Sequence, residues 1–180
     1  MKAKRRVGER THSSQAQIPQ PDRISEVTQL QQDLIRKVAR ALTSRDEVIV
    51  MAAKQLARDR YQNGKHHLAA CGWGKQQAEH YSAMQLNCKR AREASVCAEA
   101  GVLIAASMKG DELLTIVTFH GNHVHNGKHG PYVVPPCALC ATRFQRFAPN
   151  CEVIIEFEGG LVKIPQSALM LIPYPMIDVE

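Results

Sequence analysis

Apolar side chains in the first third of the chain recur every three or four residues, which predicts two helices. The first covers residues 24–42, with apolar positions at Ile24, Val27, Leu30, Leu34, Val38 and Leu42. The second covers residues 48–61, and Ser44 with Glu47 three residues later has the spacing of a capping box before it. Residues 1–23 are polar and contain two prolines, so we expect a disordered basic arm there.

Short apolar runs bounded by turn residues predict a sheet in the remainder of the chain. The expected strands cover residues 66–73, 81–86, 113–119, 153–157 and 161–164. Helical patterns lie at residues 96–108, 138–147 and 166–171. The polar segment 121–130 predicts a loop. Strands that alternate with helices indicate an α/β fold, a mixed sheet with helices on both faces.

Two cysteine blocks each open a predicted helix: Cys97-Ala98-Glu99 and Pro136-Cys137-Ala138-Leu139-Cys140. The free amides and positive dipole end of a helix N-terminus favour thiolate, the form that binds metal. Three protein ligands leave the fourth position of zinc open for water, which is the catalytic arrangement. A carboxylate beside that position can take a proton from the water. On spacing alone, however, Glu99 is equally an ordinary partner of the helix dipole.

A closed site with four protein ligands is the alternative for the metal. The fourth ligand would come from His120, His123, His125, His129 or Cys151, in a zinc module that binds nucleic acid or another protein. Otherwise the histidine-rich segment faces solvent or lines the mouth of the site.

Composition and charge set further limits. The chain has 180 residues, enough for one domain with a real core, and a net charge of +6. Much of this charge lies in the first ten residues, where no aromatic side chain interleaves the basic ones, so a solvated arm is favoured over a nucleic-acid contact. No apolar run approaches the ~18 residues that span a bilayer. No apolar segment follows the basic residues at the N-terminus, so we do not expect a secretory signal. Six cysteines, three of them suited to metal, indicate reduced thiols, and we expect a cytoplasmic protein.

From Asp46 onward the chain resembles the cytidine deaminase superfamily, in particular the small homotetrameric cytidine deaminases and blasticidin-S deaminases. The two cysteine blocks have the zinc deaminase signature, a ligand with a non-ligand Glu two residues on and then P-C-x-x-C. The resemblance implies a three-layer α-β-α sandwich with a mixed five-stranded sheet. It also implies Zn²⁺ held by Cys97, Cys137 and Cys140, with Glu99 as the catalytic acid–base residue. Residues 44–180 would then form the catalytic domain, and residues 24–43 an additional N-terminal helix.

The sequence departs from the family pattern near the metal. The family commonly has Arg after the catalytic Glu or after the last Cys, where this chain has Ala100 and Ala141. Three thiolates and one Zn²⁺ carry a formal charge of about −1, which makes a bound water less acidic. Arg143, one turn inside the second motif helix, is the residue that can compensate.

A second departure concerns the substrate. Where cytidine deaminases have Asn-x-Glu, this chain has Asn87 and then Lys89, followed by Arg90. A cation cannot accept a hydrogen bond from a ribose hydroxyl, so we expect an acidic group on the substrate, or cations that merely face water. Backbone groups before the second motif, at Pro136, and a stacking ring at Tyr174 complete the expected substrate contacts.

Three functions remain open from the sequence. The first is a zinc-dependent hydrolytic deaminase of a cytosine-type nucleoside, nucleotide or nucleoside antibiotic. The second is a deaminase that acts on polynucleotide, and the third is a zinc-stabilised binding protein without catalysis. We expect a small nucleoside-like substrate, a homo-oligomer (a tetramer, or else a dimer), and neither a membrane nor a nucleic-acid partner.

Overall fold

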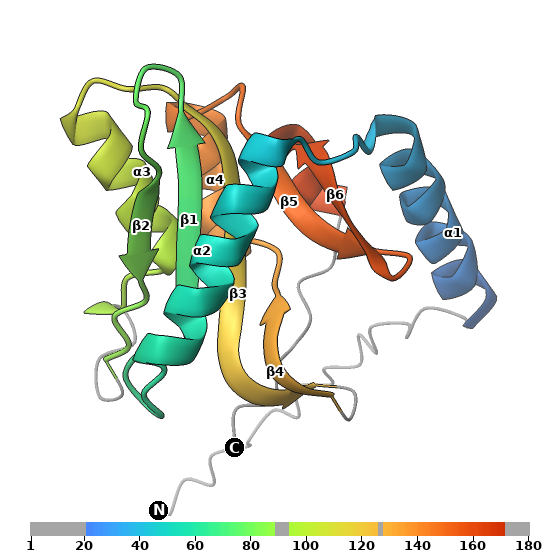
Figure 1. Ribbon diagram of the computed structural model, residues 1–180. Coiled ribbons are helices and arrows are strands. Elements are labelled where there is room, and N and C mark those ends of the chain that lie inside the picture. The colour runs from blue at the N-terminus through green and yellow to red at the C-terminus, as the bar shows by residue number, and fades with distance from the viewer. Residues whose placement is uncertain (1–20, 89–93, 126–127, 172–180) are drawn as a thin grey trace, which may run out of the picture.

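The computed structural model describes residues 21–88, 94–125 and 128–171 of the chain, which form a six-stranded mixed sheet between helices (Figure 1). The strands are β1 (Leu68–Gly74), β2 (Tyr81–Met84), β3 (Leu113–His125), β4 (Lys128–Val133), β5 (Glu152–Phe157) and β6 (Gly160–Pro165). The helices are α1 (Pro21–Val38), α2 (Ser44–Arg60), α3 (Ala98–Met108), α4 (Ala138–Phe147) and the 3₁₀ helix η2 (Gln166–Leu171).

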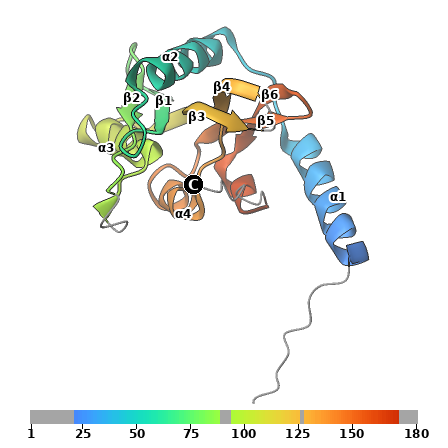
Figure 2. The same ribbon diagram turned by 90° about the horizontal axis from the view of Figure 1, so that it is seen from below.

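The sheet has the order β2-β1-β3-β5-β6, and β4 pairs with the far end of β3. Only β3 and β5 run parallel; every other pair is antiparallel. Helix α2 covers one face, and α3 and α4 cover the other (Figure 2). The predicted three-layer α/β sandwich is therefore confirmed, with six strands rather than five.

The sixth strand arises from the histidine-rich segment, where the prediction of a loop is wrong. Strand β3 continues to His125, and β4 returns along it from Lys128, with Phe119 opposite Val133 and His120 opposite Tyr132. At the polar end of this hairpin, apolar and polar residues do not alternate, so the sequence pattern gives no sign of a strand. The strand forms there because its backbone pairs with the neighbouring strand. The side chains of His123, His125 and His129 lie outside the described part of the structure.

Helix α1 lies beside the edge strand β6 rather than on a face of the sheet (Figure 2). It ends at Val38, four residues before the predicted limit, because Arg40 then pairs with Lys163 of β6 through two backbone hydrogen bonds of 2.8 and 2.9 Å. The connection to α2 thus satisfies part of an exposed strand edge. The expected basic arm lies mostly outside the described residues. None of the described helices combines the length and the apolarity that a membrane crossing requires.

Two apolar clusters fill the sandwich, one on each face of the sheet. On the α3 side, Gly101 lies so close to β2 that an added Cβ would come within 2.6 Å of the Cβ of Ala83. This close approach fixes the first turns of α3 against the sheet, and so fixes the position of the cysteine that precedes the helix.

A capping box opens α2, one residue earlier than predicted. Thr43 is the N-cap, and its hydroxyl oxygen accepts a hydrogen bond from the backbone amide of Asp46. In return, the carboxylate of Asp46 accepts a hydrogen bond of 2.7 Å from the backbone amide of Thr43. The Ser44–Glu47 register has the same spacing, but Asp46 is buried beside the ammonium of Lys163 (2.9 Å). That ion pair selects the observed register, and Lys163 also pairs with Glu152 at 3.2 Å.

We predict that Asp46→Asn lowers the free energy of unfolding by about 3 kcal/mol at neutral pH, because Lys163 loses a buried partner and α2 loses its cap. Burial by itself raises the pKa of Asp46, but hydrogen bonds from Thr43 and the charge of Lys163 lower it below the usual 3.8. The stabilisation is therefore present above pH 3.8 and lost as the pH falls through the folded-state pKa. Urea unfolding across pH should show the two proteins converging in acid. Glu47→Gln, an exposed acid on the same turn, is the control and should match the wild type.

Candidate active site

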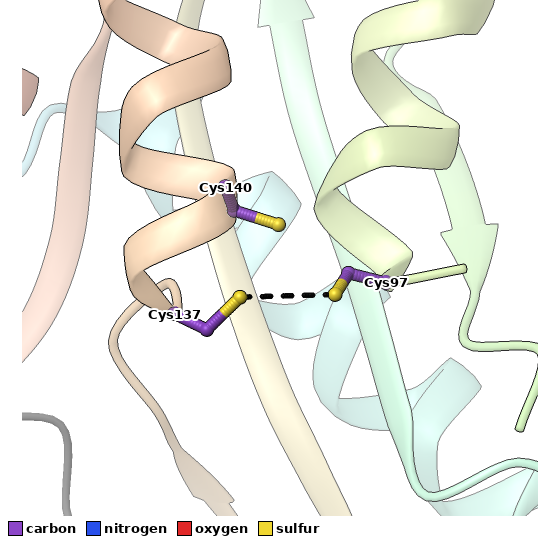
Figure 3. Close-up of side chains that lie close together, drawn as sticks. All are labelled: Cys97, Cys137 and Cys140. Atoms are coloured by element: carbon purple, nitrogen blue, oxygen red, sulfur yellow. Dashed lines mark hydrogen bonds between the residues drawn. The ribbon is translucent and has the colours of Figure 1, made fainter. Parts of the chain in front are cut away.

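Three cysteine side chains meet where the N-termini of α3 and α4 converge (Figure 3). Cys97 is the N-cap of α3, Cys137 is the N-cap of α4, and Cys140 lies in the first turn of α4. All three sulfurs lie within 4.8 Å of one another, and those of Cys97 and Cys137 are 3.8 Å apart. The structure thus brings together the three residues predicted as metal ligands, from segments 40 residues apart in sequence.

The donor set fits zinc. In a tetrahedral site with Zn–S bonds of ~2.3 Å, sulfurs lie about 3.8 Å apart, which matches the separation of Cys97 and Cys137. Among the residues with described side chains, no fourth histidine, cysteine or carboxylate joins this group. Neither His120 nor Cys151, two of the alternative fourth ligands, belongs to it, so the described ligands form an open three-sulfur set.

The electrostatics of the cluster favour a thiolate at Cys137. Hydrogen bonds from the thiols of Cys140 and Cys97, and from the amides of Cys140 and Leu139, lower the pKa of Cys137 to about 2. The pKa values of Cys97 and Cys140 are raised, mainly because their thiols donate to that thiolate. An anion stabilised by helix N-terminal amides is the form in which sulfur binds a metal.

Glu99 lies in the first turn of α3 and is only 2% exposed. Burial raises the pKa of Glu99 to about 7; the negative charge at Cys137 adds to the rise, and hydrogen bonds, including one with Thr118 of β3, offset part of it. Its Oε2 atom is buried without a hydrogen-bond partner among the described residues. A buried carboxylate with an open oxygen, beside three sulfurs, is suited to exchange protons with a bound molecule.

Sequence reasoning did not single out Gln85, whose Oε1 atom is also buried and has no hydrogen-bond partner in the described structure. The backbone amide of Gln85 donates to the carbonyl of Leu68. The next residue, Leu86, exchanges two backbone hydrogen bonds with Val96, which directly precedes Cys97. By strand alternation its side chain shares the face of Tyr81 and Ala83, toward α3. The sequence offered one signal for this residue: it is polar, yet it lies at a position where the alternation of β2 points the side chain toward the core.

The remaining predicted substrate residues are only partly visible. Pro136 is buried directly before Cys137. Asn87 is half-buried, and its amide donates to the carbonyl of Lys65 at 2.9 Å. Lys89, Arg90 and Tyr174 lie outside the described residues, so their substrate contacts stay predictions.

The two alanines that replace the usual arginines, Ala100 and Ala141, are both buried, and Ala141 belongs to the core cluster on this face of the sheet. Arg143 is half-buried and makes no ion pair with a carboxylate in the described part of the chain. Its role as a compensating cation stays a prediction.

Comparisons with known proteins agree with this arrangement. The blasticidin-S deaminase of Bacillus cereus is 30% identical over 134 residues, which cover 74% of this chain and 94% of that protein. The crystal structure of cytidine deaminase from Bacillus anthracis matches with a TM-score of 0.56 at 18% identity, covering 68% of this chain and 84% of the other. That from Burkholderia pseudomallei matches with a TM-score of 0.53 at 16% identity, covering 71% and 96%. No family model matches the chain.

The structural likenesses show the shared fold, and the identity to the Bacillus cereus protein extends over most of both sequences. On this basis the chain belongs to the cytidine deaminase superfamily.

Proposed function

We propose that the protein is a zinc-dependent hydrolytic deaminase of a cytosine-type nucleoside, nucleotide or nucleoside antibiotic. One observation carries the proposal: the open oxygen of the buried Glu99 carboxylate lies in the same site as a three-sulfur cluster that fits zinc. A buried carboxylate with one oxygen left unpaired costs free energy, which supports a role in catalysis rather than in metal binding alone.

Cys97, Cys137 and Cys140 would hold the metal. When bound, zinc supplies a water molecule acidified toward neutral pH. Glu99 would take one proton from this water and give it to the ring nitrogen as the water oxygen bonds to C4 of the cytosine. It would then take the second proton from that oxygen and give it to the amino group, which leaves as ammonia when the C4–N bond breaks and the carbonyl forms. A carboxyl group with a pKa near 7 can both accept and donate at physiological pH, which these proton transfers require.

The substrate binds on the sheet in front of Glu99. Gln85 offers a buried carbonyl oxygen that accepts a hydrogen bond from a hydroxyl or amino group of the substrate. The other proposed substrate-binding residues are Asn87 and Pro136, together with three residues outside the described ranges: Lys89, Arg90 and Tyr174. Lys89 and Arg90 favour a substrate with an acidic group. The relation to a blasticidin-S deaminase makes that antibiotic the first compound to test.

The assembly and the chain organisation belong to the proposal as well. We propose a homotetramer, with a dimer as the alternative. Residues 44–180 form the catalytic domain, preceded by a basic arm and the added helix α1, and the protein works in the cytoplasm.

The decisive experiment measures ammonia release from cytidine, cytidine monophosphate and blasticidin S by the purified zinc-loaded protein. We expect Glu99→Gln to reduce turnover at least about 10³-fold while zinc content stays unchanged, because the amide cannot carry the proton. Glu112→Gln, a carboxylate at the other end of β3, is the matched control and should retain activity. Wild-type protein that binds zinc but releases no ammonia from any of the three compounds would instead identify a binding protein.

The sulfur ligands are tested separately from turnover. Cys137→Ser should lose most bound zinc in a metal assay, since a hydroxyl is a far weaker ligand than a thiolate. Cys88→Ser changes a half-buried cysteine outside the cluster and should keep full zinc content. Equal zinc in the two variants would contradict the assignment of the ligands.

Gln85→Met should raise KM for the turned-over substrate about tenfold and leave kcat nearly unchanged, because a binding contact is lost that ground state and transition state share. The free energy of unfolding should stay constant or rise, since the change removes a buried acceptor without a partner. Loss of stability together with activity would show that Gln85 has a structural role instead.

A further inference from the structure

A second concave site lies at the opposite end of the sheet from the cysteines. The cavity has a volume of about 510 Å³ and is lined from the start of α2, the ends of β1 and β6, the starts of β3 and β5, and the turn after α4. Because Cys137 begins α4 and the lining residue Pro149 follows its end, a helix of about 15 Å separates the two sites. The cavity also lies on the α2 face, where Trp73 packs in the α2 cluster.

The polar lining of this cavity has more donors than acceptors. Three cations, Arg40, Arg45 and Lys163, line it with two carboxylates, Asp46 and Glu152, which leaves one positive charge in excess. The carboxylates are already engaged: Lys163 binds both, and Arg40 binds Glu152 at 3.0 Å. These carboxylates use part of the donor capacity of Lys163 and Arg40, and the remaining N–H groups of the two cations are the donors open to a ligand.

Lys163 supplies the buried donor. Its residue is only 8% exposed, and its ammonium has two partners, Asp46 and Glu152, for three N–H groups. Two carboxylate partners leave one N–H for a ligand, and Lys163 lines the cavity. An ammonium held in place by two carboxylates is a preorganised donor to a third oxygen.

The wall around Lys163 is rigid. The guanidinium of Arg45 stacks on Trp73 at 4.3 Å from the ring centroid, and its Nη2 donates to the carbonyls of Gly74 and Gln77. The indole N–H of Trp73 donates back to the carbonyl of Arg45 at 2.6 Å. The side chain of Arg40, by contrast, is 72% exposed at the rim, and its bond to Glu152 leaves other guanidinium N–H groups for a ligand.

We propose that this cavity is a binding site, separate from the catalytic one, for a small molecule that carries a phosphate or carboxylate group. Its volume suits a ligand the size of a sugar phosphate or mononucleotide. The oxyanion accepts from Lys163 and Arg40, and the remainder of the ligand lies against Trp73.

Trp73 is the single tryptophan of the chain, so its fluorescence reports on this cavity directly. The wild-type protein is titrated with inorganic phosphate, ribose 5-phosphate and succinate, against sodium chloride at equal ionic strength. We expect a saturable change with at least one of the three anions and none with chloride. Saturation by the two phosphates alone assigns a phosphate ligand, saturation by succinate alone assigns a carboxylate ligand, and saturation by all three assigns a general oxyanion site.

Arg40→Gln removes a cation at the rim and leaves Glu152 paired with Lys163, so the variant should fold. It should weaken Kd at least about fivefold, as expected for loss of a charge-assisted hydrogen bond. Lys75→Gln removes an exposed cation at the same end of the sheet, outside the lining, and should bind as the wild type does. Glu99→Gln should also bind normally, since the site is independent of catalysis.

Three results would overturn the proposal: no saturable change with any of the anions, the same change with chloride, or equal Kd values for Arg40→Gln and the wild type. Each can occur whether or not the protein deaminates its substrate, so the outcome is distinct from that of the ammonia assay.

Discussion

The fold brings together two groups that can carry negative charge, the buried carboxyl group of Glu99 and the half-buried thiol of Cys137, whose pKa is lowered. Like charges in a low-dielectric environment repel strongly, and each is costly to bury alone. Such an arrangement is stable when a cation lies between the groups or when one of them takes up a proton. Both solutions would serve the proposed reaction, in which the site holds a dication and passes protons through the carboxylate.

The neighbouring structure follows from this constraint. Two helix N-termini have to meet over one end of the sheet, which requires α3 and α4 to lie on the same face. The parallel pairing of β3 with β5 permits this, because each of these strands follows one of the two helices in the chain. Small residues complete the geometry: Gly101 lets α3 approach β2, and Ala141, next to Cys140 in α4, packs in the apolar core.

Much of this could be predicted from the sequence because it depends on local signals. Helical periodicity and the two cysteine blocks placed α2, α3 and α4, and the predicted ligands do converge. The wrong predictions concern features that depend on residues far away in the sequence. The capping register of α2 depends on Lys163 across the fold, the strand at 128–133 depends on pairing with β3, and α1 ends where Arg40 meets β6. Gln85 escaped notice for the same reason, since its place beside Cys97 depends on a bridge between Leu86 and Val96.

The missing arginines are best understood through the same electrostatics. A guanidinium beside the sulfurs would offset the excess negative charge of three thiolates around one dication. Positions 100 and 141 carry buried alanines instead, and Ala141 packs in the apolar cluster on this face of the sheet. The backbone supplies the compensation that is available: the amides of Leu139 and Cys140 donate to the sulfur of Cys137, at the positive end of the α4 dipole. Amides stabilise an anion without a full charge, so the site stays more negative than one with arginine. In the proposed zinc site, a more negative ligand set would hold the metal more tightly but acidify water less, which would leave a larger share of the proton transfer to Glu99.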